Sequence, residues 1–217
     1  MPTRIVLADD HTVLRLGLKA LLDMQADLEV VGEAGDGRAL LTVIRDTKPD
    51  VAIMDIGMPN LNGIDAARQA LALCPTMKIV ALSMFSDDQY VSGMFDAGAH
   101  GYVLKSCDFE ELARAVRTVM EGKYYISPGI AETVLGGFRE NRKQGLPATT
   151  PALSDRERQV LQLLSEGLAT KAIGIALNLG ERTVETHRRQ IMEKLNLHSV
   201  AELTKYAIRH GLTSLDK

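Results

Sequence analysis

The stretch VAIMDIGMPNLNG, residues 51–63, decides the fold that we predict for this chain. It begins with a short apolar run, Val51–Asp55, which is typical of a buried strand and which ends on a carboxylate. Four similar runs occur in the first 121 residues, and they are Arg4–Ala8, Leu28–Ala34, Lys78–Ser83 and Gly101–Leu104. Because helical patterns separate these runs, we predict an α/β domain with a doubly wound, five-stranded parallel sheet that carries helices on both faces.

The sequence changes character after residue 122, and we predict a domain boundary there. Residues 123–151 have the pattern of a linker, in which Ile130–Phe138 is compatible with a short helix and Arg139–Pro147 is polar. Residues 152–217 favour helix, with breaks at 167–168, 178–180 and 196–198, so we predict a small all-α domain of four helices. Ser154 and Glu157 have the spacing of a capping box and fix the start of the first helix.

The composition is that of an ordinary soluble protein, with 46% hydrophobic and 24% charged residues in a chain of 217. No apolar run reaches the roughly 18 residues that a membrane span needs, and the first residues lead directly into a strand pattern. We therefore expect a cytoplasmic protein with no membrane partner. Cys74 and Cys107 have no second cysteine or histidine at metal-ligand spacing, so we expect both to be reduced packing residues.

The charge is distributed unevenly along the chain. Residues 1–138 hold 12 Lys and Arg against 19 Asp and Glu, whereas residues 151–217 hold 10 against 8. Only the second part tends to be basic. Because a small excess of this kind is common on any domain, the charge by itself does not establish nucleic-acid binding.

Three carboxylates follow two strands of the predicted sheet. Asp9 and Asp10 come directly after the first strand, and Asp55 ends the third. Parallel neighbouring strands place such ends side by side, where the three negative charges repel one another unless a cation lies among them. A site with only oxygen ligands suits Mg²⁺, and a carboxylate beside Mg²⁺ can attack a phosphoryl group to form an acyl phosphate.

Two further strand ends carry groups that suit the same chemistry. Lys105 follows the fifth strand and can supply a cation, and Ser83 ends the fourth and can supply a hydroxyl group. Each residue also has an ordinary structural explanation, because acidic pairs often cap helices, lysines are usually solvated and strand-end serines often bond to the backbone. The joint arrangement on four strand ends favours a functional site.

These residues lie in motifs that resemble the receiver domain of two-component response regulators, which has a flavodoxin-like fold. The motifs are LADDH at 7–11, MDIGMPNLNG at 54–63, ALS at 81–83 and VLK at 103–105. The resemblance covers residues 1–122. It implies that Asp55 is the phosphoacceptor and that Mg²⁺ is held by Asp10, Asp55 and the carbonyl of Gly57, with Asp9 acting through water.

The resemblance also assigns a switch and shows one departure from the family pattern. It implies that the Ser83 hydroxyl turns toward the phosphoryl group and that the Tyr102 ring follows it inward. Many receivers have Pro after the lysine, where this chain has Ser106. A cis peptide bond is less favourable before Ser than before Pro, so the backbone geometry here is open.

The segment Glu181–Leu195 has the pattern of an amphipathic helix. Val184, Ile191 and Leu195 share one face, and Arg182, Glu185, Thr186, Arg189 and Glu193 share the other. A helix that presents Arg and Thr outward after a tight turn suits the major groove of DNA. By composition alone, a solvated surface helix explains the pattern equally well.

Three motifs resemble the LuxR/NarL (FixJ-like) helix-turn-helix, and they are LSDRERQVL at 153–161, GLATKAI at 167–173 and RTVETHRR at 182–189. The resemblance implies a DNA-binding set that consists of Lys171, Arg182, Thr183, Glu185, Thr186, His187 and Arg189. Within this set Lys171 and Thr183 would contact phosphates, whereas Glu185, Thr186 and Arg189 would face bases. Glu185 stands where many relatives carry Lys, and it can accept a hydrogen bond from a cytosine amino group. The final helix, Ser199–His210, often forms the dimer contact in this family.

The two resemblances together predict a DNA-binding response regulator. A sensor histidine kinase or a small phosphodonor would phosphorylate Asp55, which would control homodimerisation, promoter binding and contact with RNA polymerase. Such a protein is not an enzyme beyond its own phosphoryl transfer and hydrolysis. One rival is a phosphatase or mutase with an aspartate nucleophile, but these enzymes usually have a second Asp where this chain has Gly57. The other rival is a constitutive DNA-binding protein whose receiver serves only for dimerisation.

Overall fold

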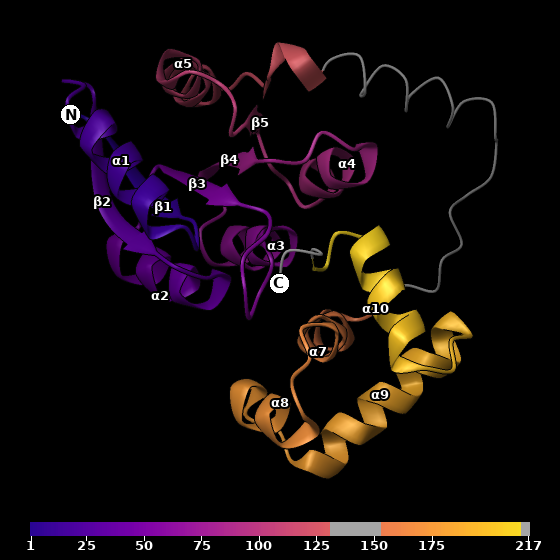
Figure 1. Cartoon of the computed structure of the whole chain (residues 1–217). Coiled ribbons are helices and arrows are strands. Elements are labelled where there is room, and N and C mark those ends of the chain that lie inside the picture. Colours follow the sequence, from indigo (N-terminus) through magenta and orange to yellow (C-terminus); the bar gives the residue numbers. More distant parts are fainter. Residues whose placement is uncertain (131–152, 214–217) are drawn as a thin grey trace. The chain divides into compact units, whose positions relative to one another are not determined.

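The computed structural model describes residues 1–130 and 153–213 (Figure 1). The chain divides into two compact units, residues 1–143 and 144–217, and each is described by itself. Within the described ranges, the helices are too short or too polar to cross a bilayer. Every peptide bond of these residues is trans, including the bond between Lys105 and Ser106.

The first unit is built around a parallel sheet with strand order β2-β1-β3-β4-β5-β6 (Figure 1). Its strands are β1 (Thr3–Ala8), β2 (Leu28–Ala34), β3 (Val51–Asp55), β4 (Lys78–Ser83), β5 (Gly101–Leu104) and β6 (Tyr125–Ile126). Its helices are α1 (Thr12–Asp23), α2 (Gly37–Thr47), α3 (Gly63–Leu73), α4 (Asp88–Asp96) and α5 (Phe109–Met120). The predicted doubly wound α/β fold is confirmed, and the predicted bounds of β2 to β5 agree with those observed.

The sheet has six strands in place of the predicted five. The additional strand is β6, which pairs in parallel with β5 through Tyr125 and Ile126. Two residues are too few to show the alternation that identifies a strand in a sequence, so β6 depends on β5 for its existence. It lies in the range that we assigned to a linker, as does the fully buried Ile130. The predicted helix Ile130–Phe138 and the polar stretch after it lie, apart from Ile130, outside the described residues.

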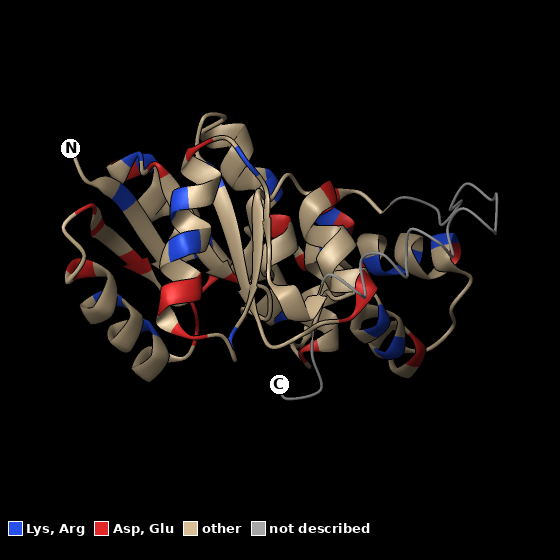
Figure 2. Cartoon of the chain, turned by 90° about the horizontal axis from the view of Figure 1, so that it is seen from above, with Lys and Arg blue, Asp and Glu red and all other residues tan. Residues whose placement is uncertain are grey.

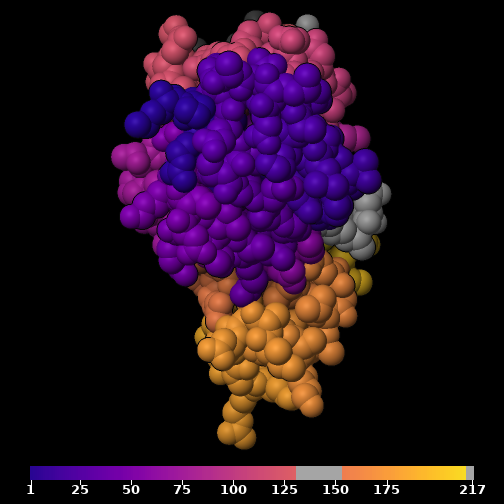
Figure 3. Space-filling model, turned by 90° about the vertical axis from the view of Figure 1, so that its left-hand side faces the viewer, coloured from indigo at the N-terminus to yellow at the C-terminus, as the bar shows by residue number. Residues whose placement is uncertain are grey.

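Alternate residues of each strand enter two separate cores, one on each face of the sheet. Along β1, Ile5 and Leu7 belong to the core under α1 and α5, whereas Val6 and Ala8 belong to the core under α2, α3 and α4. This division follows from the two-residue period of a strand. In Figure 3 the indigo and violet surface belongs to the edge of the sheet where β2 packs between α1 and α2.

The sheet topology brings the carboxyl ends of β1 and β3 together. Ala8 pairs with Met54, so Asp9 and Asp55, each one residue later, lie at the same edge. On the other side Ser83 of β4 pairs with Leu104 of β5, and the amide of Lys105 donates to the carbonyl of Ser83 at 2.8 Å. The strand order reverses at β1, which is where open parallel sheets bind their ligands.

The second unit consists of four described helices, as predicted. They are α7 (Asp155–Ser165), α8 (Thr170–Leu177), α9 (Glu181–Leu195) and α10 (Val200–Arg209). Left-handed residues stand at the predicted breaks: Gly167, Asn178 and Asn196 have φ of 85°, 53° and 51°. The core contains Val184 and Ile191 of α9, which confirms the predicted buried face. Both charges occur on these helices, as Figure 2 shows in blue and red.

Glu157 connects the start of α7 to the end of α9. Its carboxylate accepts a hydrogen bond of 2.8 Å from the amide of Ser154 in the predicted capping box, and the ammonium of Lys194 lies 2.7 Å away. The Glu157 side chain is only 4% exposed. Burial would raise the pKa of Glu157, but the hydrogen bonds from Lys194 and Ser154 outweigh burial and hold the pKa below its usual value.

We predict that Glu157→Gln destabilises the second unit by about 1–2 kcal/mol at neutral pH, because it removes half of a capping box and one ion pair. A carboxylate whose pKa is lower in the folded state stabilises the fold above its unfolded pKa, about 4.3, and loses this effect as the pH falls through the folded pKa. The difference between variant and wild type should therefore shrink in acid. Hydrogen exchange of α7 and α9 amides measures it. Glu193→Gln, at an exposed position of α9, is the matched control, and an equal effect there would contradict the prediction.

Candidate functional site

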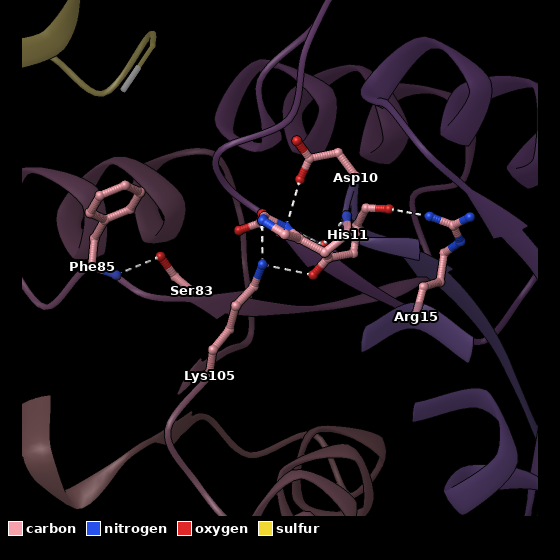
Figure 4. Close-up of polar contacts among 8 residues, drawn as sticks. Asp10, His11, Arg15, Ser83, Phe85 and Lys105 are labelled. Atoms are coloured by element: carbon pink, nitrogen blue, oxygen red, sulfur yellow. Dashed lines mark hydrogen bonds and ion pairs between the residues drawn. The ribbon is translucent and has the colours of Figure 1, made fainter. Parts of the chain in front are cut away.

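Two buried carboxylates lie side by side at the carboxyl edge of the sheet. Asp9 is 3% exposed and Asp55 is 5% exposed. The Lys105 ammonium lies 2.7 Å from Oδ2 of Asp9 and 2.8 Å from Oδ2 of Asp55, and the lysine side chain is itself only 6% exposed (Figure 4). One buried cation therefore bridges two buried anions, and the predicted convergence of these three residues is present.

Burial and ion pairing act in opposite directions on this pair. Burial raises the pKa of Asp55 above its usual value, and the charge and hydrogen bond of Lys105 offset only part of that increase. Burial lowers the pKa of Lys105, but the carboxylates of Asp55 and Asp9 outweigh burial and raise it. The ammonium thus stays charged while the Asp55 carboxylate is held in an environment that favours its neutral form.

Asp10 and His11 complete a cluster of possible metal ligands. Nδ1 of His11 lies 3.1 Å from Oδ1 of Asp9 and 3.0 Å from Oδ1 of Asp10. Ligand atoms from Asp9, Asp10, His11 and Asp55 all lie within 4.8 Å of one another. We did not single out His11 in the sequence, although its position directly after the two aspartates was a usable signal.

Arg15 of α1 holds the backbone at Asp9. Its guanidinium donates to the carbonyl of Asp9 at 2.5 Å, and its Nε lies 3.3 Å from Glu33 of β2 (Figure 4). Asp9 directly follows β1, and Glu33 lies on the neighbouring strand β2. Arg15 therefore fixes the backbone where β1 ends. Sequence reasoning missed Arg15, because nothing in the helical pattern of α1 indicates which way its side chain turns.

The two predicted switch residues meet at Phe85. The amide of Phe85 donates to Oγ of the fully buried Ser83 at 3.0 Å. The hydroxyl of the fully buried Tyr102 donates to the carbonyl of Phe85 at 2.8 Å. The Phe85 ring stacks on Tyr90 of α4, with centroids 4.3 Å apart. Ser83, Tyr102 and α4 are thus connected through one residue that the sequence analysis did not select.

Two glycines shape the loop that follows β3. A Cβ at Gly57 would lie 3.9 Å from Oδ2 of Asp55, and the Gly57 amide donates to the Asp55 carboxylate. A Cβ at Gly63 would lie 2.2 Å from the carbonyl oxygen of Asp55, so only glycine permits α3 to start so close to β3. The loop therefore brings backbone groups beside the Asp55 carboxylate, where the sequence analysis placed Gly57.

The residues at this edge fit a hard divalent cation. Three carboxylates from two strand ends offer oxygen ligands on one side, and Lys105 neutralises only part of their charge. Asp10 is partly exposed, so water molecules can complete a coordination shell. Such a set of few protein oxygens with access to water is the kind that Mg²⁺ uses.

The predicted DNA-facing residues lie along the starts of α8 and α9. Lys171, Arg182, Thr183, Glu185 and Arg189 are exposed, whereas Thr186 and His187 are half-buried. The Thr186 hydroxyl donates to the carbonyl of Arg182 at 2.9 Å, within the same helix. A carboxylate oxygen of Glu185 accepts a hydrogen bond of 2.6 Å from the hydroxyl of Thr170, a residue that sequence reasoning missed.

Comparison with known proteins agrees with this two-part arrangement. Residues 5–117 match the family described as response regulator receiver domain, and residues 151–207 match the luxR family of bacterial regulatory proteins. The chain is a response regulator of the LuxR/NarL family. The regulator is accordingly a transcription regulator, and not an enzyme of the conventional kind.

Relatives of the regulator match most of its length. The oxygen regulatory protein NreC of Staphylococcus carnosus is 38% identical over 213 residues, which cover 96% of this chain and 98% of NreC. A LuxR-family response regulator from Aurantimonas has 32% identity and a TM-score of 0.61, and covers 64% of this chain and 99% of that one. RcsB of Salmonella enterica serovar Typhimurium, bound to a promoter with the phosphomimetic beryllium fluoride, has 25% identity and a TM-score of 0.61, with 98% and 100% covered.

We predict that Asp55→Asn stabilises the regulator at neutral pH when divalent cations are removed with a chelator. A carboxylate whose pKa is raised by folding favours the fold below its unfolded pKa, about 3.9, and loses this contribution as the pH rises through the folded pKa. The melting temperature of the first unit should rise by about 4 °C, the shift that about 1 kcal/mol produces in a domain of this size.

Scanning calorimetry of the full chain measures this shift, which should vanish near pH 3, where wild-type Asp55 is protonated. Asp96→Asn, at an exposed position of α4, is the control. A decrease in melting temperature for Asp55→Asn at neutral pH would show that the ion pair with Lys105 outweighs burial.

Proposed function

We propose that the regulator accepts a phosphoryl group on Asp55 and, in response, changes its binding to double-stranded DNA. The observation that carries the first half is the buried contact of Lys105 with Asp9 and Asp55, at 2.7 and 2.8 Å. A structural ion pair needs one carboxylate, whereas here two carboxylates are buried against one ammonium. The excess negative charge gives this edge of the sheet an affinity for a cation, and the cation in turn permits an anionic phosphoryl group to approach.

The proposed reaction is transfer of a phosphoryl group from a sensor histidine kinase or from a small phosphodonor. A carboxylate oxygen of Asp55 forms a bond to phosphorus while the P–N bond of the donor histidine breaks, and the released imidazole takes a proton from solvent. Lys105 contributes a positive charge next to the transferred oxygens. Hydrolysis of the acyl phosphate returns the carboxylate, so the only turnover that we propose is phosphorylation and dephosphorylation of the regulator itself.

The proposed cofactor is Mg²⁺. Asp10, Asp55 and the carbonyl of Gly57 would hold it, with Asp9 acting through water, and when bound it would neutralise negative charge on the phosphoryl oxygens. Asp9 accepts hydrogen bonds from the amide and ring of His11 and the ammonium of Lys105, so its carboxylate is already oriented. This orientation supports an indirect role for Asp9.

The proposed switch consists of Ser83 and Tyr102. A phosphoryl group on Asp55 adds acceptor oxygens close to Ser83, and the Ser83 hydroxyl can donate to one of them. If Oγ of Ser83 turned toward that oxygen, the amide of Phe85 would lose its present acceptor. Because the Tyr102 hydroxyl is bonded to the carbonyl of the same residue, the change would reach β5 and, through the stacked Tyr90, α4.

For the second unit we propose that α9 enters the major groove. Exposed Arg182, Thr183, Glu185 and Arg189 share the outer face of α9, and exposed Lys171 lies at the start of α8. Lys171 and Thr183 would contact phosphates, whereas Glu185, Thr186 and Arg189 would face bases and His187 and Arg182 would flank them. The structure of the related RcsB bound to a promoter supports a DNA-binding role for this unit.

The proposed partners follow from the two units. A sensor histidine kinase would supply the phosphoryl group, and a second copy of the regulator would bind the other half of a DNA site through α10. RNA polymerase would be contacted at the promoter, and a DNA-binding role places the protein in the cytoplasm. We propose a receiver over residues 1–122 with β6 packed against it, a linker within residues 123–151 and a DNA-binding domain over 152–217.

The two rival functions predict different behaviour. A phosphatase needs a general acid near the nucleophile, but the position two residues after Asp55 holds Gly57. A receiver that only dimerises has no need for two buried carboxylates with one buried lysine, because burying unbalanced charge destabilises the fold. We therefore favour a working phosphoacceptor site over both alternatives.

We expect the purified regulator to incorporate phosphate from phosphoramidate in the presence of Mg²⁺, and Asp55→Asn to abolish this incorporation. The label should be sensitive to hydroxylamine, because an acyl phosphate reacts with it, and a chelator should prevent labelling. Phosphate-affinity gels and mass spectrometry measure the product. Asp50→Asn, at a half-buried position directly before β3, is a matched control. Equal labelling of Asp55→Asn and wild type would contradict the proposed site.

We expect Lys171→Ala to weaken binding to all duplex sequences about equally, by about 3- to 10-fold, and to lower the slope of log affinity against log salt by about 1. The reason is that Lys171 would neutralise one phosphate without reading a base. Fluorescence anisotropy with the full chain at several salt concentrations measures both quantities. Lys123→Ala, at an exposed position of the first unit, should leave them unchanged. A loss confined to one DNA sequence would assign Lys171 to base reading instead.

A further inference from the structure

The hydrogen bond between Thr170 and Glu185 joins the first residue of α8 to the second turn of α9. The Thr170 hydroxyl donates to Oε1 of Glu185 at 2.6 Å, a normal length for a bond from a hydroxyl group to a carboxylate. The two residues are 15 positions apart in the sequence, so the contact exists only when α8 and α9 are packed against each other. It is therefore a tertiary contact at the proposed DNA-facing surface.

The Thr170 hydroxyl does not cap its own helix. The residue that caps α8 is Ala169, which has no side-chain hydrogen bond to offer, and Thr170 is the first residue inside the helix. A threonine at such a position often bonds to its own backbone, but here the described contact of its hydroxyl is with Glu185. The hydroxyl of Thr170 is thus hydrogen-bonded to the carboxylate of Glu185 on α9.

The Glu185 carboxylate has one oxygen engaged and one available. Its side chain is 54% exposed, and the contacts that the structure describes for it both involve Oε1. The second of these is with Nη1 of Arg188, one turn further along α9, at 4.0 Å, which is beyond hydrogen-bond length. The other oxygen, Oε2, therefore remains available to an external donor.

Two groups compete for this carboxylate. Arg188 carries a positive charge three residues away on the same helix, where pairing with a glutamate is a common surface interaction. Thr170 holds the carboxylate at 2.6 Å, and the arginine stays at 4.0 Å. Without the hydroxyl, the flexible glutamate is expected to turn toward Arg188 and to place both oxygens away from the groove.

We propose that Thr170 is a positioning residue for base recognition: it fixes one oxygen of Glu185 so that the other accepts a hydrogen bond from the amino group of a cytosine in the major groove. The inference rests on the proposed function, in which α9 enters the groove. A carboxylate is an acceptor only, and cytosine N4 is the donor that it matches there. Holding the side chain beforehand lowers the entropy lost on binding, so the hydroxyl contributes to specificity without touching DNA.

The test compares five forms of the full-length regulator: wild type, Thr170→Val, Thr170→Ser, Glu185→Gln and the double variant Thr170→Val with Glu185→Gln. Each form, treated with beryllium fluoride, selects sites from a random pool of duplex DNA, and sequencing gives the base preference at each position. Valine has nearly the shape of threonine but no hydroxyl, and serine keeps the hydroxyl. Thermal unfolding of each variant checks that the second unit is intact.

We expect wild type to prefer cytosine at one position of each half-site by about tenfold, and Glu185→Gln to lose that preference. Thr170→Val should reduce the preference at that same position by about 3- to 10-fold, with no change at other positions or in affinity for non-specific DNA. Thr170→Ser should retain it. In the Glu185→Gln background, Thr170→Val should have no further effect, because the hydroxyl would act only through the carboxylate.

Two outcomes would overturn the inference, and they differ from failure of the proposed function. If Thr170→Val weakens all sequences equally and leaves the cytosine preference intact, the hydroxyl contacts a phosphate. If Thr170→Val changes preference equally in the presence and absence of the Glu185 carboxylate, it does not act through Glu185. Failure of the proposed function would appear in wild type itself, as absence of any selected DNA sequence, and would overturn both proposals together.

Discussion

The buried contact of Lys105 with Asp9 and Asp55 is the constraint on which the first unit depends. Each partner comes from a different strand end, and each is almost completely removed from water. Moving Lys105 away would leave two buried carboxylates without a cation, which costs far more than an exposed ion pair contributes. The register of β1 against β3, and of β4 against β5, is therefore tied to the electrostatics of the edge. The residues that hold this edge of the sheet together are thus the same residues that we propose for phosphorylation.

The strands could be predicted from the sequence because the sheet is parallel and buried on both faces, so that each strand is a short apolar run with polar ends. Val51–Asp55 and Lys78–Ser83 begin and end where expected. The strand β6 could not be predicted, since Tyr125 and Ile126 form a strand only by pairing with β5. The helix ends of the second unit could be predicted from Gly167, Asn178 and Asn196, because few other residues tolerate a left-handed backbone.

The residues of the candidate site also fall into those that the sequence predicts and those that it does not. Residues at strand ends, such as Asp9 and Lys105, were accessible to sequence reasoning because the topology of a parallel sheet gathers strand ends at one edge. Arg15, Phe85 and Thr170 were not, because each acts through a side-chain direction or a backbone group that no pattern in the sequence encodes. Their contacts with Asp9, Ser83 and Glu185 need the packed elements to exist first. A sequence gives the type of each residue, whereas the hydrogen-bond partner of a side chain depends on how the helices and strands pack.

Phe85 is the residue through which the proposed change at the carboxylate edge would reach α4. Its amide and carbonyl are held by Ser83 and Tyr102, and its ring is stacked on Tyr90 with an interplanar angle of 13°. Phe85 is half-buried and the residues on both sides of it, 84 and 86–89, are exposed, so water can reach its backbone groups when a protein partner is lost. If the Ser83 hydroxyl turned toward a phosphoryl group on Asp55, the Phe85 amide would exchange Oγ of Ser83 for water or for another oxygen. The coupling of Asp55 to α4 that we propose would therefore act through the hydrogen-bond partners of this one residue, and it would require no continuous path of moving side chains.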